Sequence, residues 1–115
     1  MKGKPLLPTL RTKKRYVVYE VIADNDMPLK KATESILASY KECFGIFGLA
    51  EAGIKDMNIY NDKMKRGILK INHKYVNNLR AALAMIKNIN NEKITIHTVG
   101  VSGILKKTKS RYMSL

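Results

Sequence analysis

The sequence predicts an α+β fold in which four antiparallel strands carry two helices on one face of the sheet. Apolar residues recur at helical spacing in two segments and form strand-like runs in four others. These segments follow the order strand, helix, strand, strand, helix, strand, which is the split β-α-β arrangement of ferredoxin-like domains. The chain has 115 residues and is 45% hydrophobic, which suits one compact domain with its own core. We therefore expect a single domain over residues 1–115.

The first predicted strand, residues 15–24, is the element around which the fold is organised. It contains the continuous run YVVY at 16–19 and is apolar on both of its faces. A strand of this kind lies in the middle of a sheet that is covered on both sides. Residues 1–14 precede it as a basic extended arm, in which Pro5 and Pro8 disfavour helix.

Helical periodicity predicts the first helix after Pro28, which suits a first helical turn. Apolar residues then recur at steps of three and four residues as far as Gly45, where the helix is expected to end. A short extra helical segment is expected between Gly45 and Gly53. Its apolar residues, which we expect to pack on the core, are Ile46, Phe47 and Leu49.

The second half of the chain predicts a hairpin, a helix and a last strand. Strands at 54–60 and 65–71 flank the turn at 61–63, and Asn72 is expected to cap the second helix. The buried stripe of that helix consists of Val76, Leu79, Ala82, Leu83 and Ile86. The last strand is expected at 93–103.

The last strand changes the phase of its apolar residues. Ile94 and Ile96 point to one face, whereas Val99 and Val101 fall in the opposite phase. Either a bulge shifts the phase, or the second face of the sheet is also covered. We expect partial cover of that face by the segment at 46–52, by the C-terminal tail or by another subunit.

Charge is segregated to the two ends of the chain. The formal net charge is +13, with 22 Lys and Arg against 9 Asp and Glu. Residues 1–15 contain six cations and no acid, and the basic tail at 104–115 contains four cations and no acid. Like charges that are gathered together repel each other, and binding of a polyanion relieves that repulsion. The alternative interpretation is that both ends are solvated tails. The residues that we expect to bind RNA are Arg11, Lys13, Lys14, Arg15, Lys65, Arg66, Lys106, Lys107, Lys109 and Arg111.

The geometry of the strands suggests how these cations meet RNA. The third strand has Ile68 and Leu69 where base-stacking domains carry aromatic rings, so contacts with backbone phosphates are expected instead. Gly100 and Gly103 near the end of the last strand permit close backbone approach. The start of the first strand and the end of the last strand can share one edge of the sheet, which would merge the two basic stretches into one patch.

No set of residues suggests catalysis or metal binding by this chain. Cys43 is the single cysteine and is interpreted as a packed thiol, and His73 and His97 lack acids at metal-ligand spacing. Glu34 and Glu42 are expected to face solvent without the pairing that acid–base catalysis requires. The lone cysteine and the absence of a secretion signal or membrane span in the sequence favour a cytoplasmic location.

Four motifs together resemble a known family. They are LLPTLRTKKRY at 6–16, GLAEAG at 48–53, GILKINHKYVNNLRAALAMI at 67–86 and VSGILKK at 101–107. In this order they are similar to the archaeal ribonuclease P protein component 2 family, whose domain is RRM-like. One departure is Ile104, where the family often has threonine, so this chain lacks a hydroxyl at that position.

The resemblance implies a protein subunit of the ribonucleoprotein endonuclease that removes the 5′ leader of precursor tRNA. It implies that the RNA subunit performs the hydrolysis with Mg²⁺, and that this chain binds no cofactor. It further implies a TIM-barrel protein subunit as partner and a homodimer within a heterotetramer. Two alternatives remain open from the residues: a ribosomal or RNA-chaperone protein, and a ligand-sensing regulatory domain.

Overall fold

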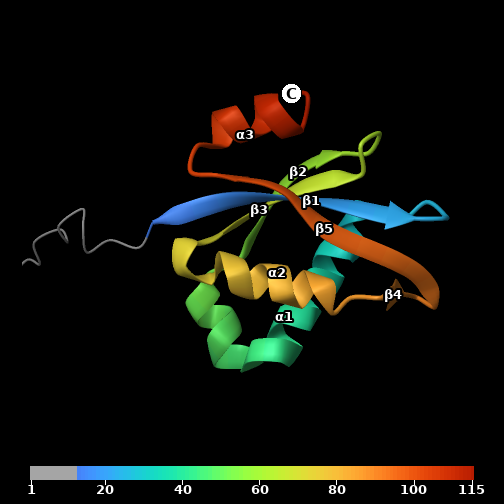
Figure 1. Ribbon diagram of the computed structural model, residues 1–115, viewed down its shortest axis with the longest axis horizontal. Helices are drawn as coiled ribbons and strands as arrows, with labels where there is room; N and C mark the ends of the chain where they lie inside the picture. The colour runs from blue at the N-terminus through green and yellow to red at the C-terminus, as the bar shows by residue number, and fades with distance from the viewer. Residues whose placement is uncertain (1–12) are drawn as a thin grey trace, which may run out of the picture.

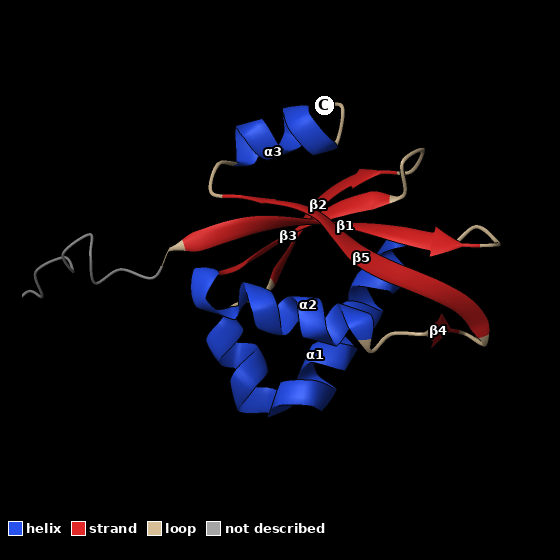
Figure 2. Cartoon of the chain, viewed as in Figure 1, coloured by secondary structure: helices blue, strands red, loops and turns tan. Residues whose placement is uncertain are grey.

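A five-stranded antiparallel sheet separates two helices on one face from a third helix on the other (Figure 1). The computed structural model describes residues 13–115. The elements are β1 (Lys14–Ala23), α1 (Leu29–Ala52), β2 (Lys55–Asn61), β3 (Arg66–Asn72), the 3₁₀ turn η2 (His73–Tyr75), α2 (Val76–Ala84), β4 (Asn88–Ile89), β5 (Glu92–Ser102) and α3 (Leu105–Tyr112). The α+β class is therefore confirmed, and Figure 2 shows its three layers.

The count of four strands was wrong by one. The sheet has the order β2-β3-β1-β5-β4, and β4 is a two-residue strand that pairs with the start of β5. Asn90 and Asn91 join β4 to β5, and both have positive φ values (52° and 66°). Two consecutive residues of that kind form the tight turn typical of β-hairpins. A strand of two residues leaves no periodicity to detect.

β1 is the central strand, as its two apolar faces predicted. It pairs with β3 on one side and with β5 on the other. Val17, Tyr19 and Val21 belong to the main core beneath α1 and α2, and Val18 belongs to a smaller core on the second face. Its side chains therefore contribute to the cores on both faces of the sheet.

α1 is bent at Gly45 rather than ended there. Gly45 has φ 78° and ψ 172°, and the helix then continues to Ala52 before the left-handed Gly53 (φ 61°) ends it. The packing expected of the segment after the bend was partly wrong, because Ile46 and Phe47 are 61% and 87% exposed. Leu49 alone of the three predicted residues packs against the core.

The second face is covered by the C-terminal tail, which forms α3. Val18, Ile68 and Met113 are fully buried there. The bulge that was the other predicted cause of the phase change in β5 is also present. The β1–β5 register shifts there and leaves Val99 without a partner in β1. Both explanations of the apolar pattern are therefore correct.

A buried tyrosine ties β1 to α1. The Tyr19 hydroxyl forms a 2.6 Å hydrogen bond with Thr33 Oγ1, and burial raises the pKa of Tyr19 well above its ordinary value. A Cβ on Gly67 of β3 would lie closer than 3.0 Å to the Tyr19 ring and hydroxyl. The Tyr19 ring therefore lies over Gly67 in the space that a side chain there would occupy.

Asn72 joins three elements instead of capping a helix. Its side chain makes no cap hydrogen bond. The Nδ2 group donates to the Glu51 carbonyl (2.7 Å), and Oδ1 accepts from Lys14 Nζ. The expected cap is thus replaced by a link between the end of α1, the end of β3 and the start of β1.

Candidate nucleic-acid interface

α3 lies on the second face of the sheet, with its two ends held at different places. Before its first turn, Gly103 lies beside Arg15, and a Cβ there would be 3.2 Å from Arg15 Nη1. Ser102 Oγ accepts a hydrogen bond from Ile104 N (3.2 Å), which directs the chain into the helix. At the other end, Arg66 Nη1 donates to the Tyr112 carbonyl (2.9 Å). The eight residues of α3 span about 12 Å.

The two faces of α3 differ in character. The residues that face the sheet recur at helical spacing and are Leu105, Thr108, Tyr112 and Met113. The Tyr112 ring lies directly on Gly100, where a Cβ would come closer than 3.0 Å to three ring atoms. Lys106, Lys107, Ser110 and Arg111 are exposed on the outer face. α3 therefore uses its apolar side for packing and presents cations to solvent.

The predicted cations of the two chain ends lie on α3 and at the adjoining start of β1. We define the α3 strip as Lys13, Lys14, Arg15, Lys106, Lys107, Lys109 and Arg111. β1 and β5 bring them together, because Tyr16 pairs with Ser102 and the start of β1 therefore adjoins the residues that lead into α3. Within residues 13–115, no carboxylate lies within 4.0 Å of any cation of the strip.

The remaining predicted residues have other surroundings. Lys65 forms an ion pair with Asp26. Arg66 Nε donates to Glu20 Oε1 (3.0 Å), and Arg66 supports the end of α3 as described above. Their charges are thus opposed by carboxylates of the same chain, which weakens their attraction for a phosphate. Arg11 lies outside the described residues.

Comparison with known proteins identifies the family. The model of the Rpp14/Pop5 family matches residues 15–113, which is most of the chain and includes all of β1 from Arg15 and all of α3. The chain belongs to the Rpp14/Pop5 family. Relatives named ribonuclease P protein component 2 confirm the resemblance that the four motifs indicated. The relative from Pyrococcus abyssi is 36% identical over 99% of this chain and 96% of its own length.

Two further relatives and one solved structure are also similar to this Rpp14/Pop5 chain. The Pyrococcus horikoshii protein of the same name is 36% identical over 98% of this chain and 93% of its own length. The Methanosarcina mazei protein is 31% identical over 96% and 92%. A chain in the cryo-EM structure of yeast ribonuclease MRP superposes with a TM-score of 0.63 over 81% of this chain and 76% of that one. At 11% identity, this last likeness shows the fold alone.

Sequence reasoning missed one polar cluster of this Rpp14/Pop5 protein. Glu20 of β1 lies between Arg66 of β3 and His97 of β5, and His97 Nε2 is 3.1 Å from Glu20 Oε2. The alternation of side chains in β1 could have placed Glu20 on the second face with Val18. Its two partners depend on strand register, which the sequence does not give. The cluster supports the C-terminal end of α3 through Arg66.

Within residues 13–115, no three His, Cys, Asp or Glu side chains are placed to hold a metal ion.

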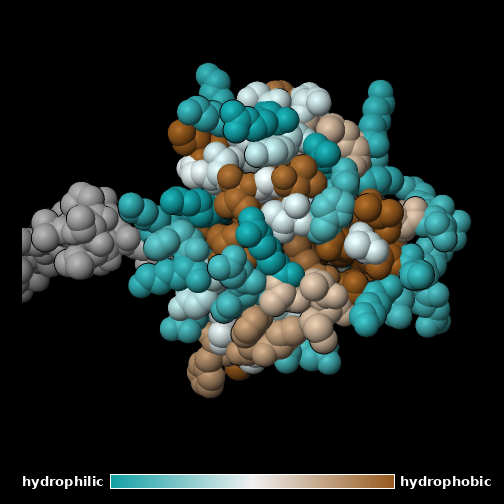
Figure 3. Space-filling view, in the orientation of Figure 1, coloured by the Kyte–Doolittle hydropathy of each residue, from teal (hydrophilic) through white to brown (hydrophobic). Residues whose placement is uncertain are grey.

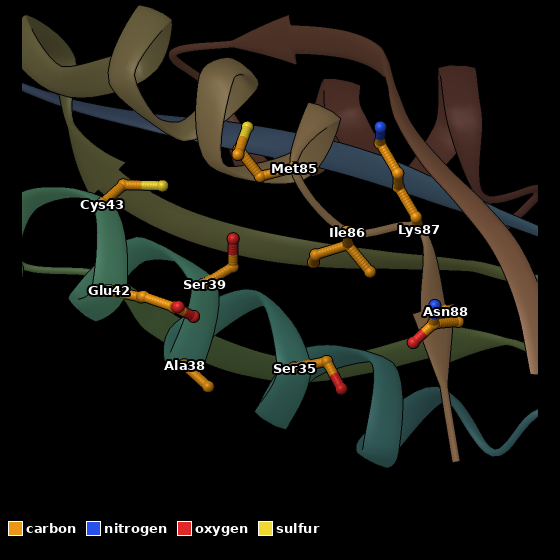
Figure 4. Close-up of a pocket in the computed structure, with 9 residues that line it drawn as sticks. All are labelled: Ser35, Ala38, Ser39, Glu42, Cys43, Met85, Ile86, Lys87 and Asn88. Carbon is orange, nitrogen blue, oxygen red and sulfur yellow. The ribbon is translucent and has the colours of Figure 1, made fainter. Parts of the chain in front are cut away.

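A cavity of about 560 Å³ between α1 and the end of α2 is lined by Glu42, Cys43, Met85 and neighbouring residues (Figure 4). Cys43 is exposed, so its interpretation as a packed thiol was wrong. Among the described residues, no helix has the length and apolarity needed to cross a membrane.

A second surface of the Rpp14/Pop5 fold is apolar and lies away from α3. Around the bend of α1 and the end of α2, large apolar side chains are exposed, namely Phe44, Ile46, Phe47 and Met85. Figure 3 shows tan and brown residues at this end of the molecule, and others over its centre and right side, whereas the surface over α3 mixes hydrophilic and apolar residues. Contiguous exposed apolar residues of this kind mark protein contacts. The molecule therefore presents a cationic face and an apolar face on opposite sides of its sheet.

Proposed function

We propose that this chain is a protein subunit of ribonuclease P and that its α3 strip binds the phosphate backbone of the RNA subunit. The observation that supports this most directly is that seven predicted cations lie on α3 and at the adjoining start of β1, where Arg15 lies beside Gly103. Among the described residues none of them has a carboxylate within 4.0 Å. The identity of the enzyme is inferred from the archaeal relatives, which are named ribonuclease P protein component 2.

The contribution of the chain would be charge neutralisation. Lys and Arg side chains on α3 displace counterions from phosphates and let RNA helices approach each other. Phosphate contacts position RNA without reading its sequence, so the strip suits support of a folded RNA. The RNA subunit would perform the hydrolysis that removes the 5′ leader of precursor tRNA, with Mg²⁺ held by RNA groups. This role also fits the expected cytoplasmic location.

The apolar face would bind protein. The exposed Phe47 and Ile46, together with the adjoining cavity that contains Met85, offer an aromatic contact and a concave site. The TIM-barrel subunit and a second copy of this chain are the partners that the family resemblance implied. Docking on this face would leave α3 free for RNA, because the two surfaces lie on opposite sides of the sheet.

Reconstitution tests the proposal. Leader cleavage of precursor tRNA is measured across Mg²⁺ concentrations with the RNA subunit and the other protein subunits, with and without this chain. We expect the chain to lower the Mg²⁺ concentration needed for half-maximal cleavage. An unchanged Mg²⁺ requirement would contradict the proposal. Ribosome co-sedimentation of the chain alongside that result would favour the ribosomal alternative.

A further inference from the structure

β5 has an outer edge that is open over most of its length. Within the described residues, β4 pairs with β5 at Glu92 and Lys93, and Ile94 N donates to the Lys87 carbonyl (3.0 Å). After Ile94 no described strand runs beside this edge, and Figure 1 shows β5 as the foremost strand of the sheet. The edge is therefore a row of backbone groups without strand partners.

The register shows which backbone groups point outward. In an antiparallel strand, the N–H and C=O of one residue point to the same side, and alternate residues point to opposite sides. Because Ile94 N–H points outward to Lys87, the backbone groups of Ile96 and Thr98 also point outward. The register shift at Val99 ends this regular stretch. We define residues 94–98 as the open edge, a length of about 17 Å.

A groove accompanies the open edge on the side of α2. A cavity of about 320 Å³ is lined by Arg80, Leu83, Ala84, Ile96, His97 and Thr98. Thr98 Oγ1 is buried and has no hydrogen-bond partner among the described residues. Arg80 is exposed and, within residues 13–115, has no carboxylate within 4.0 Å. The groove thus has an apolar wall, a free cation and unpaired backbone groups.

We propose that the open edge is a docking site for an extended acidic segment of a partner protein. The backbone of an extended partner segment could pair with the outward N–H and C=O groups of Ile96 and Thr98. Every second side chain of that segment would then enter the groove. Charge complementarity selects an acidic segment. Arg80, Lys87 and Lys93 outnumber the nearby acids Asp24 and Glu92, and Glu92 already accepts a hydrogen bond from Asn25 (3.0 Å).

RNA is the less suitable occupant of this edge. Half of the outward groups of Ile96 and Thr98 are carbonyl oxygens, which accept hydrogen bonds and repel phosphate. α3 lies on the face of the sheet opposite α2 and its groove. The docking site therefore does not depend on the RNA-binding role proposed above.

Amide hydrogen exchange tests whether a partner protein occupies the open edge. The full chain is compared alone and in the native complex isolated from cells, before and after ribonuclease digestion. We expect peptides covering residues 94–98 to exchange at least tenfold more slowly in the complex, with protection that survives digestion. Protection that disappears with the RNA would assign the edge to RNA and overturn the proposal. Equal exchange in the free chain and the complex would also overturn it.

A charge variant tests the acidic preference. The probe is a synthetic six-residue peptide of alternating Val and Glu, with a Val–Lys peptide for comparison, and binding is followed by NMR at the amides of Ile96 and Thr98. Arg80→Glu should weaken binding of the Val–Glu peptide at least tenfold, whereas the matched helix variant Lys31→Glu should not. Circular dichroism checks that both variants fold. Equal binding of the two peptides, or an unchanged affinity in Arg80→Glu, would refute the charge selection.

Discussion

The guanidinium group of Arg15 lies against Gly103, at the point where β5 has ended and α3 is about to begin. A Cβ on Gly103 would be 3.2 Å from Arg15 Nη1. The pairing of Tyr16 with Ser102 places these residues side by side, although 88 positions separate Arg15 from Gly103 in the chain. This relationship brings the two basic ends of the sequence onto one surface.

Docking of α3 depends on the absence of a side chain at Gly100. Gly100→Ala should displace the Tyr112 ring and lower the free energy of unfolding by about 1–3 kcal/mol, the usual range for overpacking. Urea unfolding measures this loss. In a Tyr112→Ala background the same Gly100→Ala change should cost far less, because the ring is gone. Equal losses in both backgrounds would show that the ring contact is not the cause.

Stability should fall at alkaline pH because of buried tyrosines. Burial raises the pKa of Tyr19, so its hydroxyl stays protonated in the folded chain at a pH where it ionises in the unfolded chain, near 10. The contribution is complete below pH 10 and declines above it, by up to about 1.4 kcal/mol per pH unit. Burial and Asp56 likewise raise the pKa of Tyr60, to about 12.

The alkaline effect of Tyr19 is separable by one substitution. Urea unfolding of the wild type and of Tyr19→Phe is compared at pH 9 and pH 11. The variant loses the hydrogen bond to Thr33 at both pH values, but the decline between them should be shallower. An identical decline in the two proteins would contradict the assignment to Tyr19.

The apolar face should matter for assembly and not for folding. Phe47 is 87% exposed, so Phe47→Ser should change the free energy of unfolding by no more than about 0.5 kcal/mol. Association with the other protein subunits, or self-association, should weaken in sedimentation velocity experiments. Lys41→Ser on the same helix is the matched control. A destabilised but normally associating Phe47→Ser protein would reverse this interpretation.

The strands and their central member could be predicted because each long strand carries its own pattern. The two apolar faces of β1 placed it in the middle. The opposite phases of Ile96 and Val99 indicated either a bulge or a covered second face, and the structure has both. α3 was missed, although Leu105, Thr108 and Tyr112 recur at helical spacing. The segment was predicted only as a basic tail, because its dense lysines drew attention to charge and not to periodicity.

The surroundings of individual side chains could not be predicted, because they depend on register and on helix geometry. The pairing of Arg66 with Glu20 follows from the alignment of β1 with β3. The exposure of Phe47 follows from the bend at Gly45, where the sequence indicated an end and not a change of direction. The convergence of Arg15 and α3 was predicted, because antiparallel neighbours bring a strand's start beside its partner's end.

The salt dependence of RNA binding tests the central claim most directly. If about six cations contact phosphates, the slope of log affinity against log salt for the ribonuclease P RNA should be roughly four to five. Changing Lys13, Arg15, Lys106 and Lys107 to Ala should reduce that slope by about three. The same change at Lys30, Lys31, Lys41 and Lys87 should leave it nearly unaltered. Equal reductions in the two sets, or an affinity for this RNA that barely responds to salt, would contradict a phosphate-binding surface on α3.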